Sequence, residues 1–199
     1  TRTLFPTEEF RFQSSNIKNV QMNGRFRYTG ANRNLPEYNE YVNGIETRTK
    51  LRAATTTGDS TAKRSNVSAD YGIVWQVSNR ISLSDQYDFW DFRQPAFNSL
   101  SEVDQSGASM LAAPGAPEAP VVTSANTFLG QKTETNTLTA AWLASSKASI
   151  SLGYRYRYRD IDRSSTAVTD ALPNGTAYTL GIHENGGILG IALRPTNQW

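Results

Sequence analysis

Residues 149–159 change character at every second position, and this alternation limits the folds open to the chain. One side of the segment carries Ile150, Leu152, Tyr154, Tyr156 and Tyr158, and the other carries Ser149, Ser151, Gly153, Arg155, Arg157 and Arg159. Only an extended strand places positions i, i+2 and i+4 on one side, whereas a helix would scatter these arginines and tyrosines around its surface. The segment is therefore predicted to be a strand between an environment that accepts aromatic and aliphatic side chains and one that accepts closely spaced cations.

Composition narrows the class of protein. The 199 residues suffice for one good-sized domain or two small ones. The net charge of +2 gives no electrostatic reason to expect a nucleic-acid partner. The absence of cysteine excludes disulfides and thiolate metal sites, and a single histidine, His183, excludes a multi-histidine cluster. The mean hydropathy of −0.52 is compatible with a membrane barrel, because the lumen face and outer loops of such barrels are polar.

The remaining sequence predicts strands joined by connections of two kinds. Eight segments have strand character: about 17–28, 45–53, 66–77, 80–92, 134–144, 149–159, 176–184 and 187–193. Short turns are expected at 77–80, 144–147 and 184–187, and the last contains Asn-Gly, a strong hairpin signal. Long polar loops are expected at about 30–44, 54–65, 93–133 and 161–175. Short turns at one end and long loops at the other predict an antiparallel up-and-down meander.

Two segments have further features. The middle of the loop predicted at 93–133 is rich in Ala, Pro and Ser, so this loop is expected to be long and flexible. Within 80–92, Asp85 and Asp91 fall on the side occupied by Leu83 and Phe89. A β-bulge near Asp85 would resolve that conflict.

The candidate functional residues follow from the alternation. A charged lumen is predicted, lined by Arg25, Arg27, Arg48, Arg52, Arg155, Arg157 and Arg159. Lipid-facing or interfacial positions are predicted for Tyr71, Trp75, Trp142, Tyr154, Tyr156 and Tyr158. Trp75 and Trp142 each precede a predicted tight turn by two or three residues, a position typical of an interfacial aromatic girdle.

Signatures of catalysis are missing from the sequence. It contains no GxSxG, HExxH, P-loop or GxGxxG pattern. Asp160 and Asp162 lack the spacing of a calcium loop, and arginines flank them. His183 has no nucleophile beside it. We therefore expect no enzymatic activity, no catalytic residue, no metal and no cofactor.

Several segments carry a resemblance to a known family: 75–84, 87–92, 152–159 and 189–196. In these segments the chain resembles outer-membrane β-barrel porins of Gram-negative bacteria. It is most similar to the large barrels that are associated with multihaem cytochromes and sheathe an electron conduit. Some of those barrels carry an amino-terminal cysteine pair, which this sequence lacks. Pro195 interrupts the last segment, which reads as a turn entering another strand, so the chain is expected to be a piece of a longer barrel.

The resemblance and the alternation together imply an all-β fold that forms all or part of a transmembrane barrel over residues 1–199. The expected role is a pore, sheath or scaffold in the outer membrane, in contact with the lipid bilayer. A multihaem cytochrome, or another outer-membrane or periplasmic protein, is the protein partner that the resemblance implies. The alternative is a secreted or cell-surface β-sandwich that binds glycans or assembles into fibres.

Overall fold

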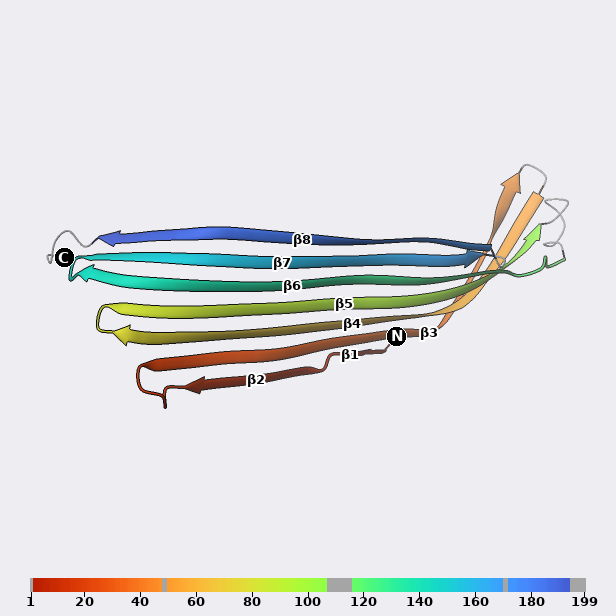
Figure 1. Cartoon of the computed structure of the whole chain (residues 1–199). Coiled ribbons are helices and arrows are strands. Elements are labelled where there is room, and N and C mark those ends of the chain that lie inside the picture. The colour runs from red at the N-terminus through yellow and green to blue at the C-terminus, as the bar shows by residue number, and fades with distance from the viewer. Residues whose placement is uncertain (1, 48–49, 107–115, 170–171, 194–199) are drawn as a thin grey trace.

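The computed structural model describes residues 2–47, 50–106, 116–169 and 172–193, and these residues form a single antiparallel sheet. Its strands are β1 (Arg2–Leu4), β2 (Thr7–Ser14), β3 (Val20–Thr47), β4 (Lys50–Ser78), β5 (Ile81–Ser106), β6 (Val121–Ser145), β7 (Ala148–Thr169) and β8 (Leu172–Leu193). From β3 onward each strand pairs with the next one in the chain, while β1 and β2 lie in succession along the free edge of β3 (Figure 1). The predicted all-β antiparallel meander is therefore confirmed, and the sheet is open rather than closed on itself.

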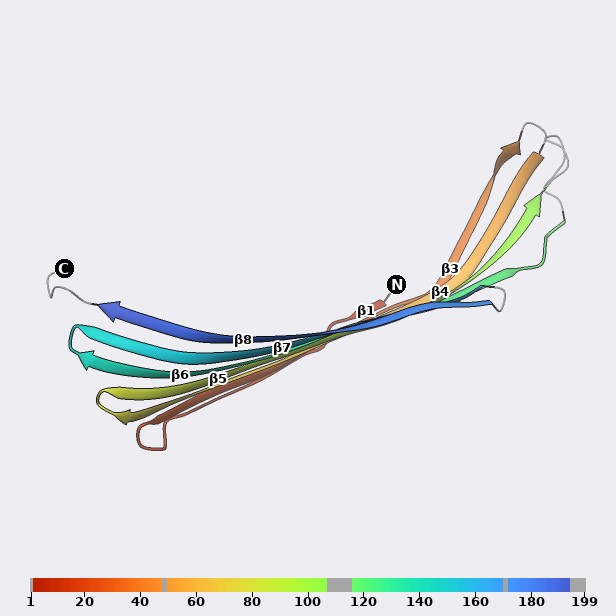
Figure 2. The ribbon, with the colours of Figure 1, turned by 45° about the horizontal axis from the view of Figure 1, so that its top comes forward.

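The strands are unusually long. β4 has 29 residues and spans roughly 95 Å at about 3.3 Å per residue, whereas most strands have about five or six residues. Figure 2 views the middle of the sheet nearly edge-on, as a single layer, with the strands fanned apart at either end. This fanning is the twist expected of paired strands. One layer is incompatible with the two packed sheets of a β-sandwich.

Tight turns join the strands at one end of the sheet. Asn79 and Arg80 connect β4 to β5, and Ser146 and Lys147 connect β6 to β7, as the sequence predicted. The turn before β3 places Asn19 at a positive φ of 63°, a conformation that asparagine tolerates better than most residues. These turns bring the two tryptophan-containing ends, of β4 and of β6, to the same end of the sheet.

The long loops predicted for the other end are wrong. Residues 30–44, 54–65 and most of 161–175 continue the strands, and so do residues 93–106 and 121–133 of the loop expected at 93–133. Residues 107–115 of that expected loop lie outside the described residues. These segments carry Thr, Ser, Ala and Asn on both faces, so they lack the apolar–polar alternation of a half-buried strand. Backbone pairing does not require that alternation, because the ladder is formed by main-chain N–H and C=O groups.

Two predicted strand boundaries are also wrong. The strand expected at 45–53 is instead the end of β3 and the start of β4, which pair with each other. The strands expected at 176–184 and 187–193 are one strand, β8, and Asn185 and Gly186 pair with Tyr156 and Arg155 inside it. The Asn-Gly signal fails here because β7 already supplies an uninterrupted partner for this segment.

Two prolines produce the irregularities that matter for the site. Pro36 has no N–H to donate, and β3 contains an extra residue between Leu35 and Tyr38, where a β-bulge shifts the register with β4. Pro95 interrupts the β4–β5 ladder, which pairs Ala62 with Ala96 and resumes in the same register at Ser65 with Arg93. Lys63 and Arg64 therefore have no partner on β5 in the described ladder.

The sheet has no hydrophobic core of its own. Among the described residues, Ala53 is the one buried hydrophobic residue and Thr135 the one buried polar residue. Large apolar side chains are instead exposed, including Trp142, Leu152 and Leu189. A soluble protein rarely exposes a contiguous apolar patch of more than a few hundred Å². The described sheet thus leaves these apolar side chains without a covering protein layer.

Candidate functional site

The register sorts the side chains into two faces, because residues directly opposite one another in an antiparallel pair project to the same side. The polar face carries Arg25, Arg27, Arg52, Arg155, Arg157 and Arg159, six of the seven residues predicted to line a lumen. Arg48, the seventh, lies outside the described residues. The opposite, apolar face carries all six predicted aromatics: Tyr71, Trp75, Trp142, Tyr154, Tyr156 and Tyr158. Contact with water in a lumen and contact with lipid remain predictions.

Hydrophobic residues on the apolar face form a belt near the tight turns, which we call the apolar band; Asp85, Asn136 and Glu134 lie among them on the same face. Its members are Phe10, Phe12, Val20, Met22, Phe26, Ala69, Tyr71, Ile73, Trp75, Ile81, Leu83, Tyr87, Phe89, Leu138, Ala140, Trp142, Ile150, Leu152, Tyr154, Tyr156, Tyr158, Leu189 and Ile191. On β5 the band runs from Ile81 to Phe89, close to the 9–11 residues with which a tilted strand crosses a bilayer. The next row on the same face contains Asp91, Lys132 and Asp160, so the band ends abruptly in charge.

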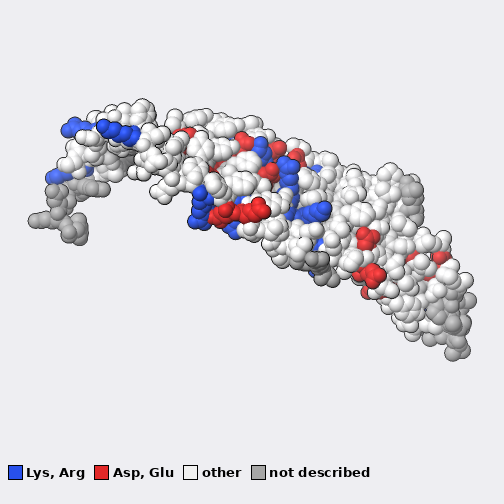
Figure 3. Space-filling view, turned by 90° about the horizontal axis from the view of Figure 1, so that it is seen from below, with Lys and Arg blue, Asp and Glu red and all other residues white. Residues whose placement is uncertain are grey.

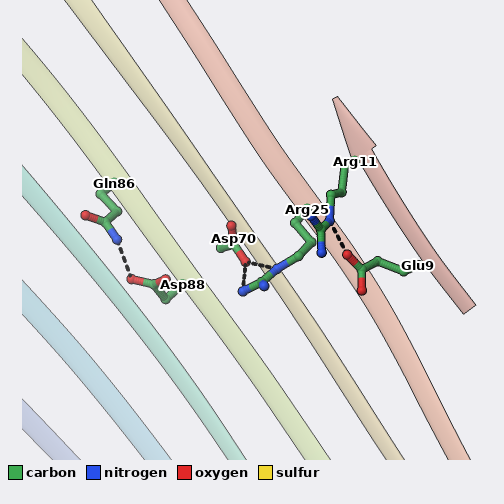
Figure 4. A network of polar contacts seen from close by, with 6 residues as sticks. All are labelled: Glu9, Arg11, Arg25, Asp70, Gln86 and Asp88. Carbon is green, nitrogen blue, oxygen red and sulfur yellow. Dashed lines mark hydrogen bonds and ion pairs between the residues drawn. The ribbon is translucent and has the colours of Figure 1, made fainter. Parts of the chain in front are cut away.

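A row of charged residues crosses the polar face at the level of the apolar band. Its members lie directly opposite one another on successive strands: Arg11, Arg25, Asp70, Asp88, Thr135, Arg157 and Glu184. We call this set the charged row. The Arg25 Nη2 atom lies 2.8 Å from Asp70 Oδ1, and Arg11 contacts Glu9 (Figure 4). Gln86 Nε2 donates to Asp88 Oδ2 at 3.3 Å. Arg11 and Arg25 are like charges placed opposite each other, and the carboxylates of Glu9 and Asp70 offset their repulsion.

Charge on the polar face is uneven across the sheet. Arg155 and Arg159 flank Arg157 on β7, and we call these three residues the arginine strip. Glu184 contacts Arg157 at 3.5 Å, whereas Arg155 lies between Thr137 and Gly186, and Arg159 between Thr133 and Ile182. The Arg159 Nε atom is buried and has no hydrogen-bond partner within the described residues. The strip therefore presents more cation than the acids beside it neutralise.

Arg52 shares the polar face but does not belong to this cluster. It lies near the start of β4, 18 positions before Asp70, which corresponds to roughly 60 Å along the strand. There it contacts Asp104 and lies 3.6 Å from Glu102. The structure thus gathers Arg25, Arg27 and the arginine strip along the middle of the sheet and leaves Arg52 in a separate, neutralised group. Figure 3 shows basic and acidic side chains interspersed in the middle of the molecule.

The aromatic residues of the apolar band contact one another across strands. The ring centroids of Tyr71 and Tyr87 lie 5.7 Å apart, and those of Tyr158 and His183 lie 4.7 Å apart. Tyr154 donates its hydroxyl hydrogen to Asn185 Oδ1 at 2.5 Å. Such cross-strand pairs stabilise the sheet locally and satisfy the tyrosine hydroxyls on a surface otherwise poor in polar partners.

Asp85 remains on the apolar face, and the bulge expected beside it is absent. β5 pairs without a register shift from Ile81 to Arg93 with β6, and from Leu83 to Arg93 with β4. Tyr71 donates to Asp85 Oδ2 at 3.2 Å, and Asn136 donates to Asp85 Oδ1 at 2.8 Å. Partners on the two neighbouring strands therefore satisfy the carboxylate where a bulge would have turned it away. We call Tyr71, Asp85 and Asn136 the Asp85 cluster.

Sequence reasoning missed part of the apolar face. β2 contributes Phe10 and Phe12 to the apolar band. Residues 9–13 read Glu-Phe-Arg-Phe-Gln, and this alternation of apolar and polar residues is the signal that indicates a strand there. Trp90 and Phe92 lie on the polar face, with parallel rings whose centroids are 5.9 Å apart. Their position was visible in the phase of the alternation, but their stacking was not.

The described residues offer little to a metal ion or a helical membrane anchor. They contain no group of three or more His, Cys, Asp or Glu side chains placed to hold a metal. Within the same residues no helix is long and apolar enough to cross a membrane, a result that does not concern strands.

Comparisons with known proteins give only weak likenesses, and all of these are to solved structures. No protein-family model matches the sequence, and no curated protein matches it. Among solved structures, the chain is similar to the ferric yersiniabactin uptake receptor of Yersinia pestis, at 10% identity and a TM-score of 0.30. The match covers 98% of this chain and 36% of the receptor, so the chain spans about a third of that protein's length.

Two further likenesses are weaker still. The translocator domain of the autotransporter NalP from Neisseria meningitidis is 10% identical, with 96% of this chain and 87% of that domain covered and a TM-score of 0.15. The Pseudomonas aeruginosa protein OccK10 is 9% identical, with 99% and 97% covered and a TM-score of 0.11. TM-scores of this size carry no information about function, so the function is inferred from the sheet itself.

Proposed function

We propose that this chain forms part of the wall of an outer-membrane β-barrel of a Gram-negative bacterium, with its apolar face against lipid and its polar face on an aqueous lumen. The observation that carries the proposal is the apolar band. It covers one face of a single-layer sheet, it is about one bilayer thick, and charged rows bound it on the side away from the turns. Hydrocarbon is the apolar phase that covers such a belt without a second protein layer.

The aromatic distribution supports this orientation. Trp75 and Trp142 lie at the turn end of the band, about half exposed, and Tyr28 follows Phe26 at its other end. Trp and Tyr rings are favoured at membrane–water boundaries because one side of the ring is apolar and the other carries a polar group. The tight turns then lie at one interface, and the strands continue far beyond the other as a polar sheet.

Closure is a requirement of this proposal. In hydrocarbon every backbone N–H and C=O needs a partner, so neither the β8 edge nor the β1/β2 edge can meet lipid unpaired. Further strands, or the two edges themselves, must complete the wall. The arginine strip would then line the lumen and favour anions, which fits a pore for small anionic solutes better than a plugged scaffold. A multihaem cytochrome as partner has no support in the structure or the comparisons and stays a prediction.

Single-tryptophan variants test the orientation. The chain has four tryptophans: Trp75, Trp90, Trp142 and Trp199. Replacement of all but one by Phe leaves a reporter on the apolar face (Trp142 or Trp75) or on the polar face (Trp90). In reconstituted vesicles, lipids brominated on their acyl chains should quench Trp142 strongly and Trp90 weakly. Acrylamide in the aqueous phase should do the opposite.

Two different quenching results would contradict the proposal. Trp142 protected from both quenchers, in protein that stays soluble without detergent, would show that a second protein layer covers the apolar face. Trp142 and Trp90 equally open to acrylamide would show that neither face meets hydrocarbon. Heat-modifiable migration on a gel serves as the control that each variant is folded.

A further inference from the structure

A cavity of about 640 Å³ opens on the apolar face just beyond the apolar band. Leu4, Tyr28 and Phe128 provide apolar walls, Lys63 and Arg93 provide cationic groups, and Asn32 provides an amide. The described residues of the wall include Lys63, Arg64 and Arg93 and no acidic residue. The cavity thus combines an apolar lining with positive charge on a surface that is otherwise mixed in charge.

Three local features of the backbone create the cavity. Pro6 follows the short strand β1, which lies beside the middle of β3 (Figure 1), and its carbonyl accepts a hydrogen bond from the Gly30 N–H at 2.8 Å. Pro95 breaks the β4–β5 ladder opposite Lys63 and Arg64. Because Gly30 has no Cβ, Pro6 and Tyr28 approach the backbone closely there; a Cβ would lie 2.9 Å from Pro6. The cavity is therefore built into the strand pairing and does not depend on a loop.

The height of the cavity relative to the apolar band is decisive. Tyr28 lies one row beyond Phe26, the last member of the band on β3, and Arg93 lies two rows beyond Phe89 on β5. With the band in hydrocarbon, as the proposed function requires, the cavity sits at the level of the lipid headgroups. On β3 and β4 the apolar wall continues into the band through Tyr28 and Val67, whereas Asp91 interrupts it on β5. A bound molecule could therefore extend along β3 from the cavity into the acyl-chain region.

The charges around the cavity favour an anionic group. Arg93 Nη2 lies 3.0 Å from Asp91 Oδ2, and this ion pair raises the pKa of Arg93. Asp162 opposes Gly130 beside Arg93 and accepts a hydrogen bond from Thr179 at 2.7 Å. Lys132 and Glu134 lie at the border of the apolar band, where they form an ion pair with each other. No acid among the described residues contacts Lys63, so Lys63 is the cation most available to a ligand.

Asn32 provides a second, independent feature. Its Oδ1 atom is buried and accepts no hydrogen bond within the described residues. A buried acceptor without a donor costs free energy, and a hydroxyl or protonated phosphate oxygen from a ligand would supply that donor.

We propose that this cavity binds a phosphorylated membrane lipid, with the phosphate at Lys63 and Arg93, a headgroup hydroxyl or protonated phosphate oxygen at Asn32 and an acyl chain along Tyr28, Phe128 and the apolar band. The proposal rests on the orientation in the proposed function and extends it to a specific lipid contact. Arginine and lysine both recognise phosphate, arginine by its paired donors and lysine as a point charge. The continuous apolar wall selects a lipid over a free phosphate.

Native mass spectrometry of the full chain in detergent tests the site with matched probes. Phosphatidic acid carries both chains and phosphate, diacylglycerol with the same chains lacks the phosphate, and inorganic phosphate lacks the chains. We expect phosphatidic acid to bind more tightly than either partial probe. The double variant K63Q/R93Q should weaken that binding roughly tenfold or more, since hydrogen bonds to charged groups contribute most strongly.

Arg33→Gln is the matched control. Arg33 follows Asn32 on β3, so its side chain lies at the same height on the opposite face, and the substitution removes charge without touching the cavity. It should leave phosphatidic acid binding unchanged. Equal weakening by R33Q and K63Q/R93Q, or equal binding of phosphatidic acid and diacylglycerol, would overturn the proposal. Tight binding of inorganic phosphate alone would overturn it in favour of a soluble anion.

A salt titration of the unmodified protein needs no variant to fold. Raising the ionic strength should weaken phosphatidic acid binding and leave diacylglycerol retention unaltered, because salt screens exposed charges. A flat response would overturn the role of Lys63 and Arg93. Trp142 quenching by brominated lipid reads the orientation separately. If that quenching is retained and phosphate preference is absent, the lipid site fails and the proposed function stands; if it is lost, the proposed function fails.

Discussion

Arg25 on β3 and Asp70 on β4 lie directly opposite each other, with Arg25 Nη2 2.8 Å and Arg25 Nε 2.9 Å from Asp70 Oδ1. Arg155 and Arg159, on the same face, oppose threonines on β6. The polar face is thus divided into a neutralised side near β2 to β5 and a cationic side near β7. This division separates arginines that lie opposite an acid from arginines that lie opposite neutral residues.

The Arg25–Asp70 ion pair is expected to contribute little to stability. The two side chains are 47% and 29% exposed, and pairs open to water typically contribute at most about 1 kcal/mol. A double-mutant cycle with Arg25→Gln and Asp70→Asn, read by urea unfolding in detergent, should give a coupling free energy below about 1 kcal/mol at physiological salt. A coupling of several kcal/mol would mean that the polar face of the sheet is dry.

The Asp85 cluster gives a stronger effect, because it lies within the apolar band. Asn136→Leu removes one of the two donors to the Asp85 carboxylate and should cost about 1.5–3 kcal/mol in lipid vesicles. The double variant D85L/N136L removes both charge and donor and should be more stable than N136L alone, because no unsatisfied carboxylate is left in hydrocarbon. Urea unfolding in vesicles measures both. A double variant less stable than N136L would show that water reaches this face.

Where one face of the sheet is apolar and the other polar, sequence alternation predicted the face on which each side chain lies. Tyr154 and Arg155 are neighbours in the chain and lie on opposite faces, as the period of two requires. The same reasoning placed Trp75 and Trp142 with them on one face. It was less informative where both faces are polar, as in residues 54–65, because nothing in the pattern distinguishes a paired polar strand from a loop.

Single residues with backbone consequences set another limit on prediction. The bulge at Pro36 reverses the faces of β3 beyond it, so Tyr38 and Glu40 lie on the polar face although the period counted from Arg25 places them on the other. Pro95 sits inside a long strand and opens a cavity where proline normally predicts an edge or a break. Both effects depend on the partner strand, which local sequence does not reveal.

Tyr38 should ionise at unusually high pH. Its hydroxyl hydrogen bond to Glu40, with smaller contributions from burial and the Glu40 charge, raises the pKa of Tyr38 above its ordinary value. A raised folded-state pKa means that the stabilising contact is complete below the unfolded pKa of about 10 and is lost as pH rises through the folded pKa. Glu40→Gln should return the pKa of Tyr38 toward its ordinary value. Difference ultraviolet titration against Tyr38→Phe isolates this tyrosine from the other eight. Identical titrations with and without Glu40→Gln would contradict the contact.

If the chain forms the proposed pore, the arginine strip should set its ion preference. R155Q/R157Q/R159Q removes three cations from the polar face, of which Glu184 neutralises one. Reversal potentials in a potassium chloride gradient across a planar bilayer should shift toward cation preference, because the charge that raises the local chloride concentration is gone. The matched control is K63Q/R93Q/K132Q, which removes the same formal charge from the apolar face. Only the first variant should move the reversal potential, since in the proposed orientation the second lies on the face turned away from the lumen. A shift of equal size in both would show that net charge alone sets the preference, and a shift in the control alone would place the aqueous path on the opposite face.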